Sequence, residues 1–192
     1  MGKRHLTPQE IIAQCKRAAR MNQKSVETSL HAMGIIFGYT LMKSEGFNGN
    51  KLSKLAKLID DTYEKLWSGE TTLEELSDRL MEKADWTIQR ETYTEENIKA
   101  RNGKYEYWLA KSMLSGANSI DYESVKYMIS MYNVLIDEFG YGQRRLTRVR
   151  EAFEKNMIDY ENGKTTLEDW KMELYNKEGV IFAVPNVEKV ED

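Results

Sequence analysis

The chain has 192 residues, of which 41% are hydrophobic, and its formal net charge is −3. That length suits one domain or two small lobes that share a core. The negative charge excludes attraction of the whole molecule to nucleic acid, so such binding must come from a local patch. The single cysteine, Cys15, excludes an internal disulfide and a zinc site made mainly of thiolates, and it suits a cytoplasmic protein.

No stretch has the length and apolarity of a membrane-spanning helix. The most apolar window, residues 32–42, has eleven residues, whereas a spanning helix needs about 20. The N-terminal residues are basic but lack the apolar run of a signal peptide. We therefore expect a cytoplasmic protein without membrane contact.

Helix-forming residues dominate the chain, and only two prolines occur. This composition predicts an all-α fold of helices joined by short corners. The first helix is expected over 8–21, because Thr7 and Glu10 are placed to form a capping box around Pro8. Helical spacing of apolar residues predicts a second helix over 23–44.

Glycines and threonines separate the elements that follow. Gly46 is expected to end the second helix, and a third helix is predicted over 51–67. Thr71 or Thr72 then caps a fourth helix with acidic residues in its first turn. Further helices are expected over 94–115 and 121–139.

The two halves of the chain resemble each other when they are aligned, without gaps, at a displacement of 94 residues. "TTLE" at 71–74 then falls on "TTLE" at 165–168. Other matched positions are Gly46 and Gly140, Phe47 and Tyr141, Leu52 and Leu146, Leu55 and Val149, Ile59 and Phe153, and Gly69 and Gly163. We interpret them as two pseudo-repeats of helix, glycine-aromatic corner, helix, Gly-x-Thr-Thr corner, helix. The expected organisation is an N-terminal basic helix (1–24), repeat 1 (25–88), a connecting helix (89–118), repeat 2 (119–182) and a tail (183–192).

The sequence offers little for catalysis, and we expect no cofactor. Nucleophilic catalysis of the Ser-His or Cys-His kind needs an oriented histidine, but His5 lies at the N-terminus and His31 within a helix. A magnesium-dependent hydrolase is the enzyme alternative, because carboxylates recur at helical spacing. These pairs are Asp61 with Glu64 and Glu75 with Asp78. Repeat 2 lacks both pairs, so we interpret them as solvated helix faces and expect a protein that is not an enzyme.

Basic residues gather after the second glycine-aromatic corner, in "FGYGQRRLTRVR" at 139–150. Gly140, Tyr141 and Gly142 form a turn that opens a helix, whose free amides and positive dipole end favour an anion. The surrounding cations are Arg144, Arg145, Arg148 and Arg150, together with Lys51, Lys54 and Lys57 of repeat 1 and Arg17 and Arg20 of the N-terminal helix. We predict a basic surface for nucleic acid or another anionic partner. The alternative is a structural corner that tolerates surface arginine.

The turn at 140–142, followed by apolar Leu146 and Val149, resembles the helix-hairpin-helix element, which binds DNA phosphates without reading sequence. On a larger scale, "FGYGQRRLTR" with "GKTTLEDW" and "GFNGNKLSKL" with "GETTLEEL" resemble small helical proteins of phages and prophages of Gram-positive bacteria. Some proteins of that kind are anti-CRISPRs that inhibit type II-A Cas9. The resemblance implies a non-enzymatic blocker in the cytoplasm of the bacterial host that binds Cas9 with its guide RNA, or its DNA. The alternative is a nucleic-acid-binding phage accessory protein, and a homodimer stays open in either case.

Overall fold

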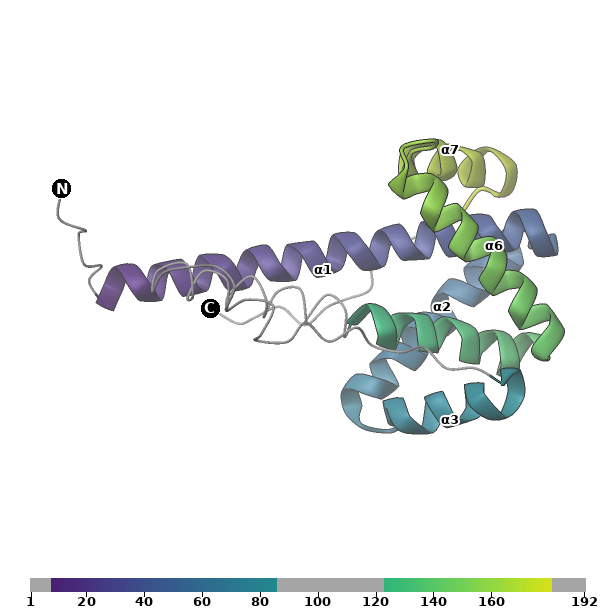
Figure 1. The fold of residues 1–192 in the computed structure, drawn as a ribbon, viewed down its shortest axis with the longest axis horizontal. Helices are drawn as coiled ribbons and strands as arrows, with labels where there is room; N and C mark the ends of the chain where they lie inside the picture. Colours follow the sequence, from purple (N-terminus) through teal and green to yellow (C-terminus); the bar gives the residue numbers. More distant parts are fainter. Residues whose placement is uncertain (1–7, 86–122, 181–192) are drawn as a thin grey trace.

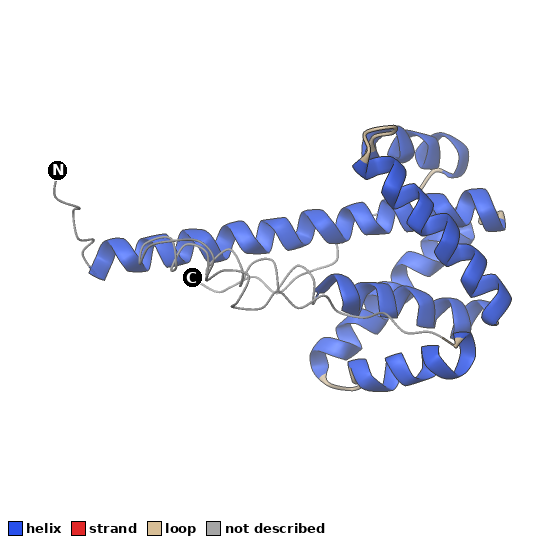
Figure 2. Cartoon of the chain, in the orientation of Figure 1, coloured by secondary structure: helices blue, strands red, loops and turns tan. Residues whose placement is uncertain are grey.

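Helices joined by short corners make up the residues that the structure describes. A computed structural model describes residues 8–85 and 123–180, with the side chains of the first helix from residue 24 onward. Its helices are α1 (Pro8–Glu45), α2 (Gly49–Ser68), α3 (Leu73–Ala84), a helix that includes residues 123–139, α6 (Gln143–Glu161) and α7 (Leu167–Glu178) (Figure 1). No strand occurs in these two ranges (Figure 2), so the predicted all-α fold is confirmed. The helix expected over 94–115, the connecting helix at 89–118 and the tail at 183–192 fall outside the described residues.

α1 is one helix where two were predicted. It continues through Asn22 for 38 residues, so the expected break between helices over 8–21 and 23–44 is wrong. An interior asparagine is less favourable than alanine by only about 0.7 kcal/mol, and strong helix formers flank this one. At about 1.5 Å per residue, α1 is about 57 Å long. Its N-terminal half extends away from the other labelled helices (Figure 1), and the boundary predicted at residue 24 lies inside it.

Side-chain caps fix the starts of α3 and α7. The Thr72 hydroxyl accepts from the Glu75 amide at 3.2 Å, and the Glu75 carboxylate accepts from the Thr72 amide at 2.9 Å. Thr166 and Asp169 form the same capping box, at 3.2 and 3.0 Å. Each box satisfies amides that have no partner within the helix. The cap predicted at Thr71 or Thr72 is therefore Thr72.

Helices from the two halves of the chain are paired crosswise. α6 and α7 pack on α1, where the rings of Phe37 and Phe153 meet edge to face at 5.8 Å. α2 and α3 pack instead on the 123–139 helix, through the Tyr63 and Tyr127 rings at 5.9 Å and an Asn133 side chain that donates to the α3 backbone at 3.0 Å. Helices of both halves therefore contribute to one shared core.

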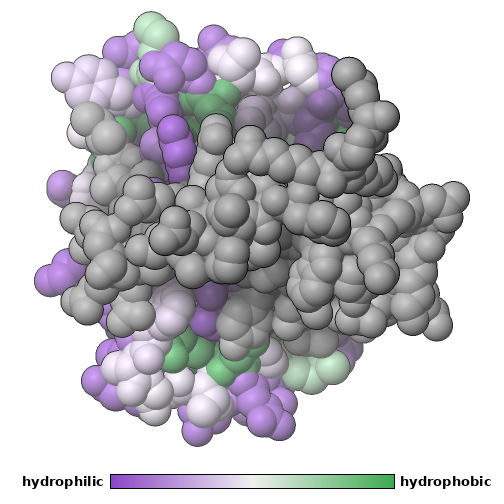
Figure 3. All heavy atoms as spheres, turned by 90° about the vertical axis from the view of Figure 1, so that its left-hand side faces the viewer, coloured by the Kyte–Doolittle hydropathy of each residue, from purple (hydrophilic) through white to green (hydrophobic). Residues whose placement is uncertain are grey.

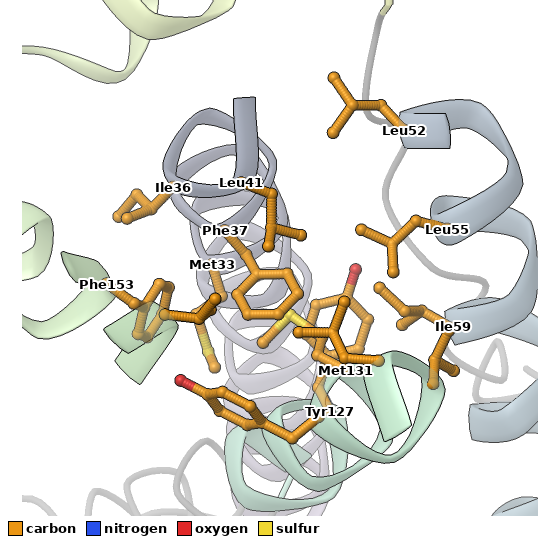
Figure 4. Close-up of a cluster of buried hydrophobic side chains, with 14 of the residues drawn as sticks. Met33, Ile36, Phe37, Leu41, Leu52, Leu55, Ile59, Tyr127, Met131 and Phe153 are labelled. Carbon is orange, nitrogen blue, oxygen red and sulfur yellow. The ribbon is translucent and has the colours of Figure 1, made fainter. Parts of the chain in front are cut away.

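The core lies where these helices cross. Figure 4 shows α1 side chains between those of α6 on one side and those of α2 on the other, with Phe37 in the middle. Phe37, Leu55 and Ile59 are at most 1% exposed. From the side on which α1 begins, the described surface is mostly hydrophilic, with a few apolar residues between the polar ones (Figure 3). Isolated apolar residues of this kind are normal for a protein surface.

Backbone geometry agrees at several positions that the displacement of 94 residues matches. Gly46 and Gly140 have φ of 66° and 63°, and Gly69 and Gly163 have φ of 76° and 67°. These are left-handed conformations that glycine adopts without steric cost. The matched corners therefore share one backbone form, while the pseudo-symmetry of the two repeats as whole bodies stays a prediction.

Candidate functional site

The two glycine-aromatic corners meet at one end of the helical assembly. After each positive-φ glycine the aromatic amide donates back to the preceding helix, from Phe47 to the Leu41 carbonyl at 3.2 Å and from Tyr141 to the Leu135 carbonyl at 3.0 Å. Both aromatic side chains are 3% exposed, and their rings lie 6.3 Å apart in an edge-to-face contact. The predicted turn residues Gly140 and Tyr141 are therefore part of the packed structure.

The N-termini of α2 and α6 start on either side of this aromatic contact, and the two are capped differently. At α2 the Asn48 side chain accepts from the Lys51 amide at 3.1 Å, and the Gly49 amide donates to the Glu178 carboxylate at 2.8 Å. Gly142 caps α6 with backbone alone and has no side-chain hydrogen bond. Neither helix has an acidic residue in its first turn. Both helices keep the partial positive charge of a helix N-terminus. At α6 less of this charge is offset, because no side chain accepts a hydrogen bond from its first amides.

Two of the predicted arginines are engaged by Glu45, the last residue of α1. Arg148 Nε donates to Glu45 Oε1 at 2.7 Å, while Arg145 Nε and Nη2 both donate to Oε2 at 3.2 Å. The Tyr141 hydroxyl donates to the same Oε2 at 3.2 Å, and the Arg145 guanidinium lies 3.8 Å from the Tyr141 ring centroid. The Glu45 side chain is 2% exposed, whereas those of Arg145 and Arg148 are 45% and 57% exposed. A buried carboxylate thus joins α1 to the second corner beneath a solvated arginine pair.

The contacts around Glu45 shift the pKa values of Glu45, Tyr141 and Arg148. Burial by itself would raise the pKa of Glu45, but the hydrogen bonds from Arg148 and Arg145 outweigh it and hold that pKa below its ordinary value. Burial and the Glu45 charge raise the pKa of Tyr141 to about 12. Its hydrogen bond to Glu45 raises the pKa of Arg148 further. The carboxylate is therefore ionised at neutral pH, and Arg148 stays charged.

The lysines of α2 face aromatic rings instead of a buried carboxylate. Lys51 Nζ lies 5.6 Å from the Phe47 ring centroid, and Lys54 Nζ lies at the same distance from that of Phe139. Lys54 also forms an exposed ion pair with Glu138 at 3.2 Å. Lys57, one turn further along α2, is exposed. Cation-π contacts of this kind are weak at a surface and leave the ammonium group charged and accessible.

The remaining predicted cations divide into two sets. Arg144 is exposed and forms no ion pair with another described residue, while Arg150 lies 3.7 Å from Glu154 on the same helix. Arg17 and Arg20 belong to α1, and even Arg20 stands 25 residues before Glu45, or about 37 Å along the helix. The cations of α2 and α6 lie together at one end of the helical assembly, whereas the two α1 arginines lie far from that end. Of the cations predicted for the basic surface, Arg17 and Arg20 therefore lie apart from those at the corners.

A second buried polar group, which the sequence reasoning missed, lies near the C-terminal end of α2. The Tyr63 hydroxyl donates to Glu123, whose other oxygen is 3.2 Å from Lys126 Nζ. That ammonium also lies 4.2 Å from the Trp67 ring centroid. Nearby, burial and the charges of Asp61 and Glu64 raise the pKa of Asp60 to about 6.

No metal-binding cluster appears among the described side chains, which are those of residues 24–85 and 123–180. In that part of the chain no three His, Cys, Asp or Glu side chains gather closely enough to hold an ion. Asp61, Glu64, Glu75 and Asp78 therefore do not form the magnesium site on which the hydrolase alternative depended. The same described residues include no helix with the length and apolarity to cross a membrane.

Comparison with protein-family models, with curated proteins and with solved structures gave no match. The most informative residue, Glu45, was not predicted from sequence, because its partner Arg145 lies 100 positions away. The only local signal was an acidic residue directly before a glycine corner.

Proposed function

We propose that this protein is a non-enzymatic binding protein that contacts nucleic acid, free or within a Cas9 complex, at the two corners. The surface in question is defined by five cations within the first two turns of α2 and α6, and we call it the corner surface. They are Lys51, Lys54, Arg144, Arg145 and Arg148. The observation that supports the proposal is that the Phe47–Tyr141 contact brings these two basic helix starts together.

The charge of the corner surface opposes that of the whole chain. Its five cations face three nearby carboxylates, those of Glu45, Glu138 and Glu178, which leaves an excess of two positive charges. The complete chain carries −3, so negative charge predominates elsewhere. Such a separation orients a polyanion toward one end of the molecule and repels it from the rest. Amides at a helix N-terminus add donors that suit phosphate oxygens.

The likeness to phage and prophage proteins gives the proposal its specific form, an anti-CRISPR that blocks DNA cleavage by Cas9. Cas9 holds guide RNA and target DNA in basic channels. A protein with one basic end and a net negative charge over the rest of the chain can present the first to the nucleic acid and the second to those channels. A phage accessory protein that binds DNA or RNA directly is the second form, and the corner surface supports it equally.

The direct-binding form is tested with cations that the structure leaves unpaired. We expect the wild-type chain to retain labelled duplex DNA with a dependence on salt, and Lys51→Glu with Arg144→Glu to abolish that retention. Each lost phosphate contact flattens the plot of log K against log salt by about 0.9. Lys65→Glu, at the other end of α2, is the matched control and should bind as wild type does. Equal losses in both variants would show that the corner surface is not the site.

The inhibitor form is tested by a cleavage assay. Purified protein in excess should stop a type II-A Cas9 with its guide RNA from cutting target DNA, and the Lys51→Glu, Arg144→Glu variant should restore cutting. Block of cleavage without binding to free DNA favours the inhibitor over the accessory protein. Normal cutting at excess protein rejects inhibition of that Cas9.

A further inference from the structure

The contact around Glu45 has the composition of a site for an external anion. One carboxylate accepts from two guanidinium groups and a tyrosine hydroxyl, over distances of 2.7 to 3.2 Å. Proteins hold the carboxylate or phosphate groups of ligands with the same donors, because charge-assisted bonds from arginine are short and directional. Here the anion comes from the chain itself.

We propose that Arg145, Arg148 and Tyr141 form an anion-binding site that the chain fills with its own Glu45, and that a nucleic-acid phosphate competes with Glu45 for the two arginines. The inference rests on the proposed function, because it takes the corner surface as the place where nucleic acid binds. It assigns Glu45 the role of an internal competitor that weakens this binding.

Competition follows from which edges of the guanidinium groups are in use. Arg145 gives its Nε and Nη2 edge to Glu45, and Arg148 gives its Nε. A side-on, two-pronged contact with a phosphate would use the same edges. An arginine that turns outward leaves a side chain that is only 2% exposed with fewer donors, and an unpaired buried charge is costly. A phosphate that takes the side-on contact therefore displaces Glu45 from these donors.

The first corner shows the arrangement without a buried carboxylate on its cations, since Glu178 there accepts from the Gly49 amide. The position that matches Glu45 there is Phe139, at the displacement of 94 residues. Lys54 lies over the Phe139 ring and pairs only with Glu138, whose side chain is 42% exposed. An exposed pair is screened by water and opens at little cost. Lysines of the first corner are thus available to phosphate, whereas Arg145 and Arg148 are held back.

The test compares Glu45→Gln with Glu138→Gln, using a fluorescein-labelled DNA duplex as the probe. Each variant removes one negative charge beside the corner surface, but only Glu45→Gln frees the two arginines. We expect Glu45→Gln to bind about three- to tenfold more tightly and to steepen the slope of log K against log salt by about 1 to 2. Glu138→Gln should leave that slope unchanged. Equal slopes for wild type and a folded Glu45→Gln variant would overturn the inference.

A second pair of variants keeps Glu45 and does not depend on the folding of Glu45→Gln. Arg148→Gln leaves Arg145 on the carboxylate, and Arg144→Gln removes an unpaired cation. We expect Arg144→Gln to flatten the salt slope by about 0.9 and Arg148→Gln to leave it nearly unchanged. Equal flattening by both would show that Glu45 does not withhold Arg148.

The outcomes separate this inference from the proposed function. If neither wild type nor Glu45→Gln retains DNA at any salt concentration, the direct-binding form of the proposed function fails, and the inference about Glu45 fails with it. If wild type binds and Glu45→Gln binds equally, only the role of Glu45 fails. Binding by Glu45→Gln alone supports the internal competitor and shows that wild type masks the site. Capture of an acidic protein in place of DNA by Glu45→Gln would overturn the choice of phosphate as the competing anion.

Discussion

The corners at 46–48 and 140–142 share a backbone but differ in the groups that surround them. Both have a glycine with φ near 65° followed by an aromatic side chain that is 3% exposed. Around the first corner the helix start is closed by Asn48 and Glu178, and its lysines face rings. Around the second corner the helix start is open, and its arginines hold a buried carboxylate. The comparison shows that the turn is set by the fold, whereas the chemistry is set by what packs opposite.

Ion pairs elsewhere in the two halves also show that matched positions can carry different charges. Lys43 pairs with Glu173 at 2.5 Å, and Arg79 pairs with Asp137 at 2.6 Å. The residues correspond across the displacement of 94 positions, Lys43 to Asp137 and Arg79 to Glu173, with the charges exchanged. Because exposed pairs contribute only about 0 to 1 kcal/mol, either order of charges serves the same junction.

The largest expected effect comes from removing either corner aromatic. Phe47→Ala and Tyr141→Ala should each lower the free energy of unfolding by about 3 to 5 kcal/mol, because both rings fill the core between the helix starts. Urea denaturation followed by circular dichroism measures the change. Tyr175→Ala, at a side chain that is 59% exposed, is the control and should change stability by less than about 0.5 kcal/mol. A loss below about 1 kcal/mol in either corner variant would contradict equal roles for the two rings.

The next largest expected effect depends on how much room each helix start leaves for a side chain. A Cβ on Gly49 would overlap the backbone oxygen of Glu178, so Gly49→Ala should cost about 2 kcal/mol through overpacking. The matching residue on α6, Gln143, is exposed, and Gln143→Ala should cost less than about 0.5 kcal/mol. Thermal unfolding of both variants provides the measurement. Similar melting temperatures for the two would show that α7 does not press against the start of α2.

Acid should weaken the second corner more than the first. The pKa of Glu45 is lowered in the folded chain, so its contribution to stability is complete above its ordinary pKa and is lost as pH falls through the folded value. Glu45→Gln should be less stable than wild type by about 1 to 2 kcal/mol at pH 7, and this difference should shrink in acid. Urea titrations across pH measure it. A difference that stays constant down to strongly acidic pH would contradict an ionised Glu45.

The smallest expected effect comes from a substitution that makes the second corner resemble the first. Gly142 has φ of −95° and ψ of 178°, with open space where a side chain would begin. Gly142→Asn should therefore add the cap that Asn48 supplies and stabilise the chain by about 0.5 kcal/mol. Differential scanning calorimetry against wild type resolves a shift of this size. A lower melting temperature would show that the open start of α6 is required by its surroundings.

Local signals predicted most helix ends, because the groups that form them are close in sequence. A threonine and an acidic residue three positions later close a capping box without help from the rest of the chain, as at Thr72 and Thr166. The continuity of α1 at Asn22 was missed, because a weak local preference is easily outweighed by the neighbouring turns. Arg144, Arg145 and Arg148 looked alike in sequence, yet only the last two hold Glu45.

By itself, the sequence determined that the chain is helical, where its glycine corners turn and which side chains carry charge, since these follow from short-range hydrogen bonds, propensity and composition. The tertiary structure alone decided that the halves pair crosswise and that the two basic helix starts lie together. It also decided that Arg145 and Arg148 are engaged by a carboxylate 100 and 103 residues away. Contacts at such separations depend on how whole helices pack, and no local pattern of residues encodes that packing.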